Sequence, residues 1–306
     1  MIDGCSIVVS GKWIKVASVH EENWLEGEVV KNPALTMKKI KDSKLDADIF
    51  AFSQKVSDPK PKHPFHFEWD NVAAIPIIDY ADWWEKRLSR KARQEVARAE
   101  RLGVVIKCVE FDEEFLSGVV ELFGKIRTKQ GRAFSHHGKD RETIRKEVST
   151  FPERSRFIGA YAGNELIGYL KLVFLDGGAS ILNIITSDLH YDKRPGNALL
   201  ARAVKVCEER KLSHLLYGKY TYGNKTGSSL TEFKRRNGFE KVLVPRYFVA
   251  LGWKGKVAIK LKLHLGALGI LPPRMISLIL NLRSALFRLK TGGGKADMGE
   301  QLTSKN

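Results

Sequence analysis

A glycine stands at the start of an apolar helical segment, directly after two basic residues, in the run Lys193-Arg194-Pro195-Gly196-Asn197-Ala198. Such a glycine lets backbone N–H groups approach an anion closely, and the helix dipole favours negative charge at that end. The pattern predicts a pyrophosphate-binding turn formed by Lys193, Arg194, Gly196, Asn197 and Ala198. The alternative is a Pro-Gly turn that only begins a helix.

Three other side chains could carry charge or move protons beside this turn. Lys234 could hold a phosphate or polarise a carbonyl oxygen as a cation, or donate a proton if its pKa were lowered. Asp188 follows one apolar strand pattern and Tyr217 ends another, where a base or an acid could reach the reacting carbon. These three are the catalytic candidates. The alternative for each is a structural role, and for Lys234 a solvated lysine beside Arg235 and Arg236.

The sequence gives little reason to expect a metal. His136 and His137 are adjacent, so they face different ways, and we find no Asp or Glu at ligand spacing. A loop that faces the substrate is the better interpretation. The three cysteines, Cys5, Cys108 and Cys207, are too scattered for a disulfide framework or a paired-cysteine site, which favours a reducing compartment.

The elements that would position these residues follow from hydrophobic periodicity. Three strand patterns come in sequence, separated by turn residues, and helical and strand patterns then alternate to the last strand. This order predicts a mixed α/β sheet and not a Rossmann arrangement. The predicted strands are Arg156–Tyr161, Leu166–Phe174, Ala179–Thr186, His214–Tyr217 and Glu240–Leu251, and the helices are Gly196–Arg210 and Ser229–Arg236.

The first 150 residues are less regular. The patterns predict mainly short strands and loops in the first eighty residues, one helix over Asp82–Arg101 closed by Gly103, and a loop over Arg127–Lys139. The helix over Asp82–Arg101 has a basic stripe that could bind phosphates or be a solvated face with i,i+4 ion pairs. The other predicted elements are strands at Ser6–Val9, Trp13–Val16, Ile49–Phe52, Val72–Ile78 and Val104–Val109, and helices from Asp112 to Ile126 and from Glu142 to Val148.

This order of elements, with its residues, resembles the acyl-CoA N-acyltransferase (GNAT) superfamily over roughly residues 105–251. The run from Lys193 to Ala198 is similar to that family's pyrophosphate loop, with Lys in the first position. The run Phe233-Lys234-Arg235-Arg236-Asn237-Gly238-Phe239 resembles its late helix, which ends in Gly-Phe before the last strand. The resemblance implies an acyl-CoA co-substrate, most simply acetyl-CoA.

The Fem-type (FemAB-like) branch of that superfamily is a closer match. Leu88–Val104 resembles the characteristic helix of that branch. Pro195–Leu200 resembles its Pro-Asn helix start, and Phe233-Lys234 resembles its Phe-Lys element. Two departures matter. Lys234 stands where ordinary GNAT enzymes carry a proton-donating Tyr, and no long heptad segment matches the helical arm with which peptidoglycan enzymes grip tRNA.

The net charge of +17 is concentrated near the C-terminus. Residues 1–240 hold 40 basic and 33 acidic groups, whereas Lys241 to Ala296 hold eleven basic groups and no acidic one. No apolar run approaches the roughly 18 residues of a spanning helix, and no signal peptide is predicted. The pattern therefore predicts basic amphipathic helices over 252–290. It favours docking on the protein itself or on an anionic membrane surface over binding to nucleic acid. We expect residues 291–306 to be disordered.

Together these observations predict a mixed-sheet GNAT fold with an incomplete N-terminal GNAT-like lobe, 1–104, and a complete C-terminal acyltransferase domain, 105–251. The expected activity moves an acyl group, acetyl most simply, from acyl-CoA to an amine of a small molecule or a lipid-linked cell-envelope precursor, without a metal. The expected location is the cytoplasm or the inner face of the membrane. The rivals are an aminoacyl-tRNA-dependent Fem-type transferase and a non-enzymatic membrane-surface adaptor.

Overall fold

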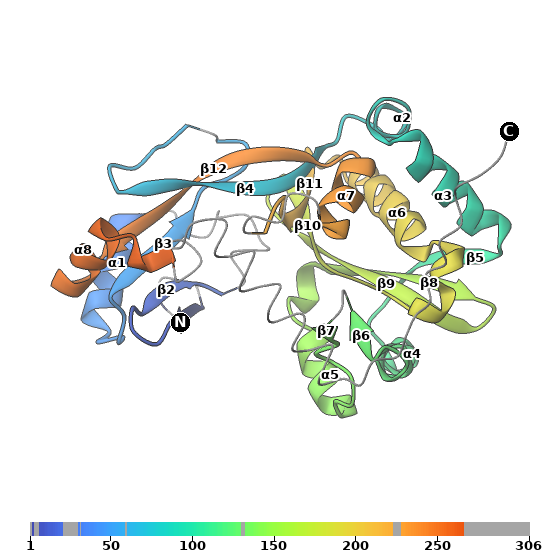
Figure 1. Cartoon of the computed structure of the whole chain (residues 1–306), viewed down its shortest axis with the longest axis horizontal. Coiled ribbons are helices and arrows are strands. Elements are labelled where there is room, and N and C mark those ends of the chain that lie inside the picture. The colour runs from blue at the N-terminus through green and yellow to red at the C-terminus, as the bar shows by residue number, and fades with distance from the viewer. Residues whose placement is uncertain are drawn as a thin grey trace, which may run out of the picture.

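The computed structural model describes residues 2, 6–20, 30, 32–58, 60–129, 132–222 and 228–265. Within these residues, ten strands form one mixed sheet in the order β1-β2-β3-β12-β4-β11-β10-β9-β8-β5 (Figure 1). The pairs β2–β3 and β10–β11 are parallel and the others antiparallel. The strands are β1 (Ile7–Ser10), β2 (Val16–Val19), β3 (Ile49–Ser53), β4 (Phe67–Pro76), β5 (Val104–Val109), β8 (Ser155–Ala162), β9 (Glu165–Phe174), β10 (Gly178–Thr186), β11 (His214–Lys219) and β12 (Glu240–Ala250).

Helices cover both faces of the part of the sheet that contains β8–β10. In Figure 1, α3 and α6 lie on one face and α4 and α5 on the other, while α1 and α8 lie at the far end, beside β3. Most begin at a capping side chain; Ser89, Asp112 and Ser228, for example, each accept a hydrogen bond from a backbone N–H three residues later. The described helices are α1 (Pro33–Asp42), α2 (Tyr80–Asp82), α3 (Arg90–Arg101), α4 (Glu113–Lys125), α5 (Arg141–Val148), α6 (Pro195–Glu209), α7 (Ser229–Arg236) and α8 (Trp253–Lys260).

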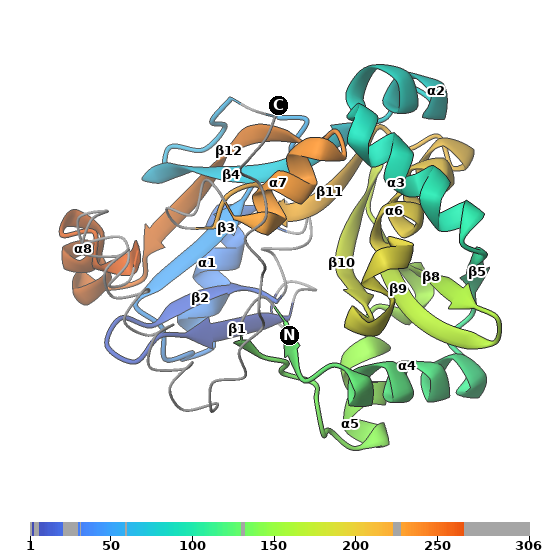
Figure 2. The same ribbon diagram turned by 45° about the vertical axis from the view of Figure 1, so that its right-hand side comes forward.

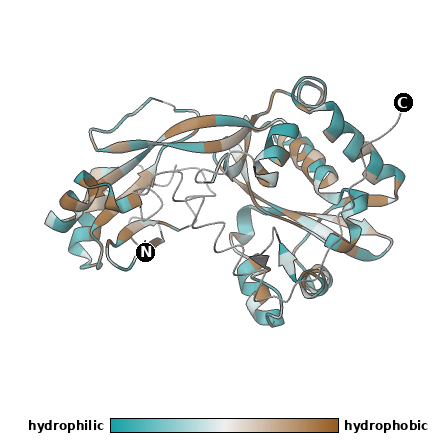
Figure 3. Ribbon diagram, in the orientation of Figure 1, coloured by the Kyte–Doolittle hydropathy of each residue, from teal (hydrophilic) through white to brown (hydrophobic). Residues whose placement is uncertain are grey.

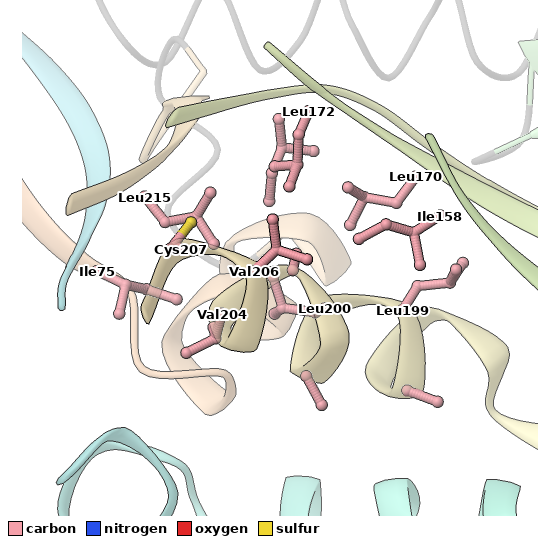
Figure 4. Packing of buried hydrophobic residues seen from close by; sticks show 14 of the residues in the cluster. Ile75, Ile158, Leu170, Leu172, Leu199, Leu200, Val204, Val206, Cys207 and Leu215 are labelled. Atoms are coloured by element: carbon pink, nitrogen blue, oxygen red, sulfur yellow. The ribbon is translucent and has the colours of Figure 1, made fainter. Parts of the chain in front are cut away.

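Helix α6 forms the centre of the largest hydrophobic core. Its apolar side chains pack against β8, β9, β11 and β4, as the labelled residues of Figure 4 show. Leu199, Leu200 and Cys207 are fully buried, and burial raises the pKa of the Cys207 thiol to about 12. The outer helix α3 is mainly hydrophilic (Figure 3) and buries only Ala92 and Ala99. This packing fixes the start of α6 relative to the sheet.

The long strands β4 and β12 connect the two ends of the sheet. Both belong to one antiparallel pair that runs from Glu240 opposite Ala74 to Tyr247 opposite Phe67. Strand β4 also pairs with β11, and Ala73 and Ile75 lie in the same core as α6. Part of the segment 1–104 thus packs in that core. The division into lobes at residue 104 stays a prediction.

The structure confirms a mixed α/β sheet and most of the predicted elements from residue 104 onward. The predicted single helix over Asp82–Arg101 is wrong, because the chain turns extended at Leu88 and a new helix begins after Ser89. Arg93 stabilises this break by donating hydrogen bonds to the carbonyls of Trp84, Glu85 and Leu88.

Three other predictions need correction. The expectation of mainly short strands and loops in the first eighty residues missed α1, whose cap at Asn32 and Pro33 at N1 are ordinary helix-start signals. The strand predicted at Trp13–Val16 lies three residues later, as β2. The predicted loop over Arg127–Lys139 contains the short hairpin β6 (Thr128–Lys129) and β7 (Arg132–Ala133).

The C-terminal predictions are only partly covered. Of the segment 252–290, the structure describes α8 and the 3₁₀ turn Leu263–Leu265, so a helix does form after β12. Residues 266–290 and the predicted disordered tail 291–306 lie outside the described residues. Among the helices that the structure describes, none has the length and apolar character needed to cross a membrane.

Two glycines with positive φ allow a test of the packing between α7 and the break before α3. At Gly238 (φ +81°) a Cβ would lie 3.0 Å from Arg87 Cβ and 3.2 Å from Trp83 Nε1, whereas at Gly103 (φ +73°) it would meet nothing within 4 Å. We expect Gly103→Ala to cost about 1–2 kcal/mol of backbone strain and Gly238→Ala measurably more. Urea unfolding of both variants checks this, and equal losses would contradict it.

Candidate functional site

The two parallel strands at the centre of the sheet separate after three residues. Strands β10 and β11 pair only between Gly178–Ser180 and His214–Leu216, although β10 continues to Thr186 and β11 to Lys219. Figure 2 shows the two strands diverging from there. The register of β11 against β4 also shifts between Leu216 and Lys219, which marks a β-bulge.

A cavity of about 530 Å³ lies at this separation of the strands. It is bounded by α3, the ends of β10 and β11, the start of α6 and helix α7. Its lining mixes apolar and charged side chains, as ligand sites commonly do. The lining residues are Lys91, Ala92, Glu95, Lys129, Ile184, Thr186, Tyr191, Arg194, Pro195, Gly196, Asn197, Tyr217, Ser229, Leu230, Glu232, Phe233, Arg236 and Asn237.

The start of α6 points its first turn at this cavity. Arg194 precedes the helix in a left-handed conformation (φ 54°), Pro195 is at N1, and no side chain caps the helix. Pro195 has no N–H and the Asn197 N–H donates to the Arg194 carbonyl at 3.3 Å, so the Gly196 N–H is the one in this turn that faces an anion, with the positive end of the helix dipole. A Cβ on Gly196 would have one neighbour within 4 Å, Thr186 Cγ2 at 3.8 Å, so the space beside the turn is open.

The five predicted donor-binding residues do not all reach the cavity. Arg194, Gly196 and Asn197 line it, while Lys193 is half-buried outside the lining and Ala198 is buried in the core. Arg194 is already neutralised, because its Nε lies 2.6 Å from Glu95 Oε2 and its guanidinium covers the Tyr191 ring at 4.2 Å. Its charge is thus shared between α3 and the start of α6.

A short hydrogen-bond chain joins α6 to α7 and to the break before α3. Asn197 Nδ2 donates to Asn237 Oδ1 at 3.1 Å, and Asn237 Nδ2 donates to the Phe233 carbonyl at 2.8 Å. The Asn237 carbonyl accepts from Trp83 Nε1 at 3.0 Å. Asn237 and Trp83 are almost fully buried, so these bonds are shielded from water and fix one wall of the cavity.

Lys234 is buried and does not line the cavity. Its ammonium donates to the carbonyls of Tyr217 at 2.7 Å and Lys219 at 2.6 Å, on the two sides of the bulge in β11, and lies 4.5 Å from the centre of the Tyr217 ring. Burial lowers the pKa of Lys234 to about 7. In this position Lys234 holds the bulge in place; it reaches the cavity only through its neighbour Tyr217.

Tyr217 lines the cavity and Asp188 does not. Burial raises the pKa of the Tyr217 phenol above its ordinary value, so the hydroxyl stays protonated at neutral pH. Asp188 is exposed at the start of the 3₁₀ segment Asp188–Lys193 that follows β10. Of the three catalytic candidates, the structure therefore brings Tyr217 to the cavity and Lys234 behind it.

Sequence reasoning missed Lys129. This residue, in the hairpin β6–β7, lines the cavity and donates from Nζ to the Ile184 carbonyl at 3.0 Å. Burial lowers its pKa to about 8, and the negative charge of Asp188 acts in the opposite direction. A lysine with this pKa is partly neutral near pH 7.5 and could accept a proton. The sequence places this lysine in a predicted loop, and no local pattern indicates that the folded protein buries its side chain.

His136 is placed in a different cluster. Its Nδ1 lies 2.8 Å from Glu147 Oε2, and its ring packs between Phe123 and Phe134. His137 is exposed. A carboxylate partner for His136 therefore exists, eleven residues away in sequence on α5, where spacing alone could not indicate it.

Comparisons with known proteins support the fold and not the sequence family. No protein-family model matches the sequence, and a search of curated proteins finds no match. Among solved structures, the chain is similar to FemX (TM-score 0.58, 10% identity), covering 84% of this chain and 86% of that chain. It is also similar to L-PGS from Bacillus licheniformis (TM-score 0.53, 15% identity; 86% and 85% covered).

A third similar structure is the C-terminal domain of a putative lysylphosphatidylglycerol synthetase from Agrobacterium fabrum (TM-score 0.51, 14% identity; 84% of each chain). The ten-stranded mixed sheet, the separated parallel strands and these matches define the class: the chain has a GNAT/FemAB-like fold. The resemblance expected from the sequence is confirmed at the level of the fold.

Because Lys234 is buried, it should make the unfolding free energy of the protein depend on pH. Between its folded pKa of about 7 and its ordinary value of 10.5, the unfolded chain binds more protons than the folded chain, so this residue makes stability rise with pH. We expect the unfolding free energy of wild type, minus that of Lys234→Met, to rise by up to about 1.4 kcal/mol per pH unit from pH 7 to 9.5.

Chemical denaturation at several pH values measures this difference. Lys241→Met, a change at an exposed lysine of β12, should follow the wild-type profile. Parallel pH profiles for wild type and Lys234→Met would show that Lys234 is not buried as described.

Proposed function

We propose that the protein is an acyltransferase that binds its acyl donor where β10 and β11 separate. The observation that carries the proposal is that the cavity at this separation ends on the uncapped start of α6. The Gly196 N–H and the positive end of the helix dipole suit the phosphates of a donor, and the open space beside Gly196 lets a donor approach. The first candidate donor is an acyl-CoA, with acetyl-CoA the simplest, and the first candidate acceptor is an amine.

The side chains around the cavity can supply the chemistry of direct transfer. The amine attacks the thioester carbonyl, the C–N bond forms and the C–S bond breaks. Lys129, in its neutral form, can take the proton from the amine, and the protonated Tyr217 hydroxyl can donate to the leaving sulfur. Lys234 is a positioning residue that holds the Tyr217 backbone. In this scheme the nucleophile is the acceptor amine itself, and no cysteine lines the cavity.

A second candidate donor is an aminoacyl-tRNA. The similarity to FemX, to L-PGS and to the putative lysylphosphatidylglycerol synthetase domain extends over more than four fifths of each chain. For an ester donor the leaving group is a ribose hydroxyl in place of a thiolate, and the acceptor could be a lipid hydroxyl or an amine. The exposed basic side chains of α3, such as Lys91 at the cavity rim, would then meet the tRNA backbone.

The turn at Gly196 offers a matched pair of variants. Gly196→Ala adds a Cβ 3.8 Å from the nearest atom and should leave donor binding nearly unchanged. Gly196→Glu adds a negative side chain at the helix start and should weaken donor binding by at least about tenfold. Calorimetric titration with acetyl-CoA, longer acyl-CoAs and charged tRNA measures both. If the two variants bind every donor as wild type does, the proposed donor site is wrong.

A transfer assay separates the candidate donors. The full chain is incubated with acetyl-CoA, longer acyl-CoAs or charged tRNA over a panel of amines and anionic lipids, and products are detected by mass spectrometry. Product from an acyl-CoA supports the first donor, and product that requires charged tRNA supports the second. No product with any donor, together with intact vesicle binding, would favour the non-enzymatic adaptor.

We also propose that α8 attaches the protein to an anionic membrane surface. Its buried residues Gly255 and Ala258 dock the helix on the sheet. The opposite side exposes Trp253, Val257 and Leu261, at spacings of four, by 78%, 45% and 58%. Lys256 and Lys260 are also exposed on this helix, in a stretch without acidic residues. An exposed apolar stripe with flanking lysines suits anionic lipid headgroups.

Vesicle sedimentation tests this attachment. Trp253→Ser should weaken binding to phosphatidylglycerol-containing vesicles by about tenfold, because a large apolar side chain no longer enters the lipid. Ile78→Ser, at a 68% exposed position just before α2 at the other end of the molecule (Figure 1), should bind as wild type does. Equal vesicle binding by wild type and Trp253→Ser would show that α8 does not contact the membrane.

A further inference from the structure

Three potential metal ligands meet where the turn after α8 touches the start of β4. They are His66, Glu68 and His264, and their ligand atoms all lie within 4.8 Å of one another. His66 and Glu68 are two residues apart in extended chain, so their side chains share one face. His264 comes from the 3₁₀ turn Leu263–Leu265, almost two hundred residues later. Sequence spacing gives no hint of this cluster.

His264 is the buried member of the cluster. Its side chain is 0% exposed, its ring packs 4.4 Å from the Phe248 ring, and its Nε2 makes no hydrogen bond within the described part of the chain. That nitrogen lies 3.4 Å from Glu68 Oε1. A buried, unsatisfied ring nitrogen beside a carboxylate oxygen is costly unless something lies between them.

The tautomer of His264 indicates which kind of group would lie between its Nε2 and the Glu68 carboxylate. Its other nitrogen, Nδ1, faces the Ala258 carbonyl at 3.5 Å, which favours a proton on Nδ1. Nε2 of the neutral ring then presents a lone pair to another acceptor, the Glu68 carboxylate. Two acceptors that face each other call for a cation. A backbone carbonyl that accepts from the far ring nitrogen is also usual behind a metal-bound histidine.

The distances from Glu68 to the two histidines fit a first-row metal ion, and the ligand atoms of His66 and His264 lie within 4.8 Å of each other. Zinc–ligand bonds of about 2.0–2.2 Å in tetrahedral geometry place the ligand atoms about 3.3–3.5 Å apart. Glu68 Oε1 lies 3.6 Å from His66 Nε2 and 3.4 Å from His264 Nε2. The side chains of His66 and Glu68 are 45% and 29% exposed, so water could supply a fourth ligand. Two imidazoles and one carboxylate favour Zn²⁺ over Mg²⁺ or Ca²⁺.

We propose that His66, Glu68 and His264 bind one zinc-class divalent ion, which clamps the C-terminal turn to β4. This departs from the expectation, drawn from the sequence, that no metal binds. The site would fix α8 on the sheet from its C-terminal side, because His264 follows α8 by four residues. The proposal does not depend on the proposed acyl transfer, since none of its three residues lines the cavity.

Metal binding to the untagged full chain tests the proposal. After chelator treatment, we expect ZnCl₂ to bind at one ion per chain and to raise the melting temperature, and CoCl₂ to give the visible absorption of a four-coordinate site. Glu68→Gln and His264→Gln should each bind Zn²⁺ at least about tenfold more weakly and lose the thermal shift. His137→Gln, at an exposed histidine outside the cluster, should behave as wild type does.

The melting temperature of each metal-free variant shows whether it is folded. If His264→Gln fails to fold, Glu68→Gln, at a more exposed position, and the Co²⁺ spectrum of wild type still decide the matter. Absence of stoichiometric binding, or equal binding by wild type and both ligand variants, would overturn the proposal. A stability that depends on pH and not on zinc would show that a proton on His264 is the cation.

Discussion

The two hydrogen bonds from Lys234 hold the bulge of β11 beside the cavity. The carbonyls of Tyr217 and Lys219 accept from the buried side chain of this lysine on α7, where the register of β11 against β4 shifts. Pairing between β10 and β11 has already ended at Ser180 and Leu216, and the strands separate. A carbonyl shielded from water and left without a donor costs about 1–3 kcal/mol, and Lys234 supplies a donor to both carbonyls.

The surrounding elements meet at this separation because each is fixed by a different contact. Helix α6 is held by its apolar face, α7 by the Asn237 carbonyl bonded to Trp83, and α3 by the pair of Glu95 with Arg194. The cavity thus combines an uncapped helix start with two lysines of lowered pKa, Lys129 at its wall and Lys234 behind it. This combination supports the proposed acyl transfer.

Much of this fold could be predicted from local patterns. The meander β8–β10, helix α6 and the turn at Gly196 follow from alternation, helical periodicity and turn residues, which act over short distances. The break at Leu88 could not be predicted, since Arg93 stabilises it through three carbonyls that only folding brings together. The sequence indicated Lys234 as a reactive group, because local patterns could not show that it is buried and donates to two carbonyls of β11. These contacts are the basis for proposing it as a positioning residue. Lys129 and the His66–Glu68–His264 cluster depend on contacts between segments far apart in the chain and left no local pattern.

Hydrogen–deuterium exchange of the full chain with and without donor tests most directly whether the acyl donor binds where β10 and β11 separate, as we propose. With saturating acyl-CoA or charged tRNA, we predict that amide protection is concentrated at the end of β10 and the start of α6, around Thr186 and Arg194–Asn197. Protection confined to other segments, or no change in these two with either donor, would contradict the account.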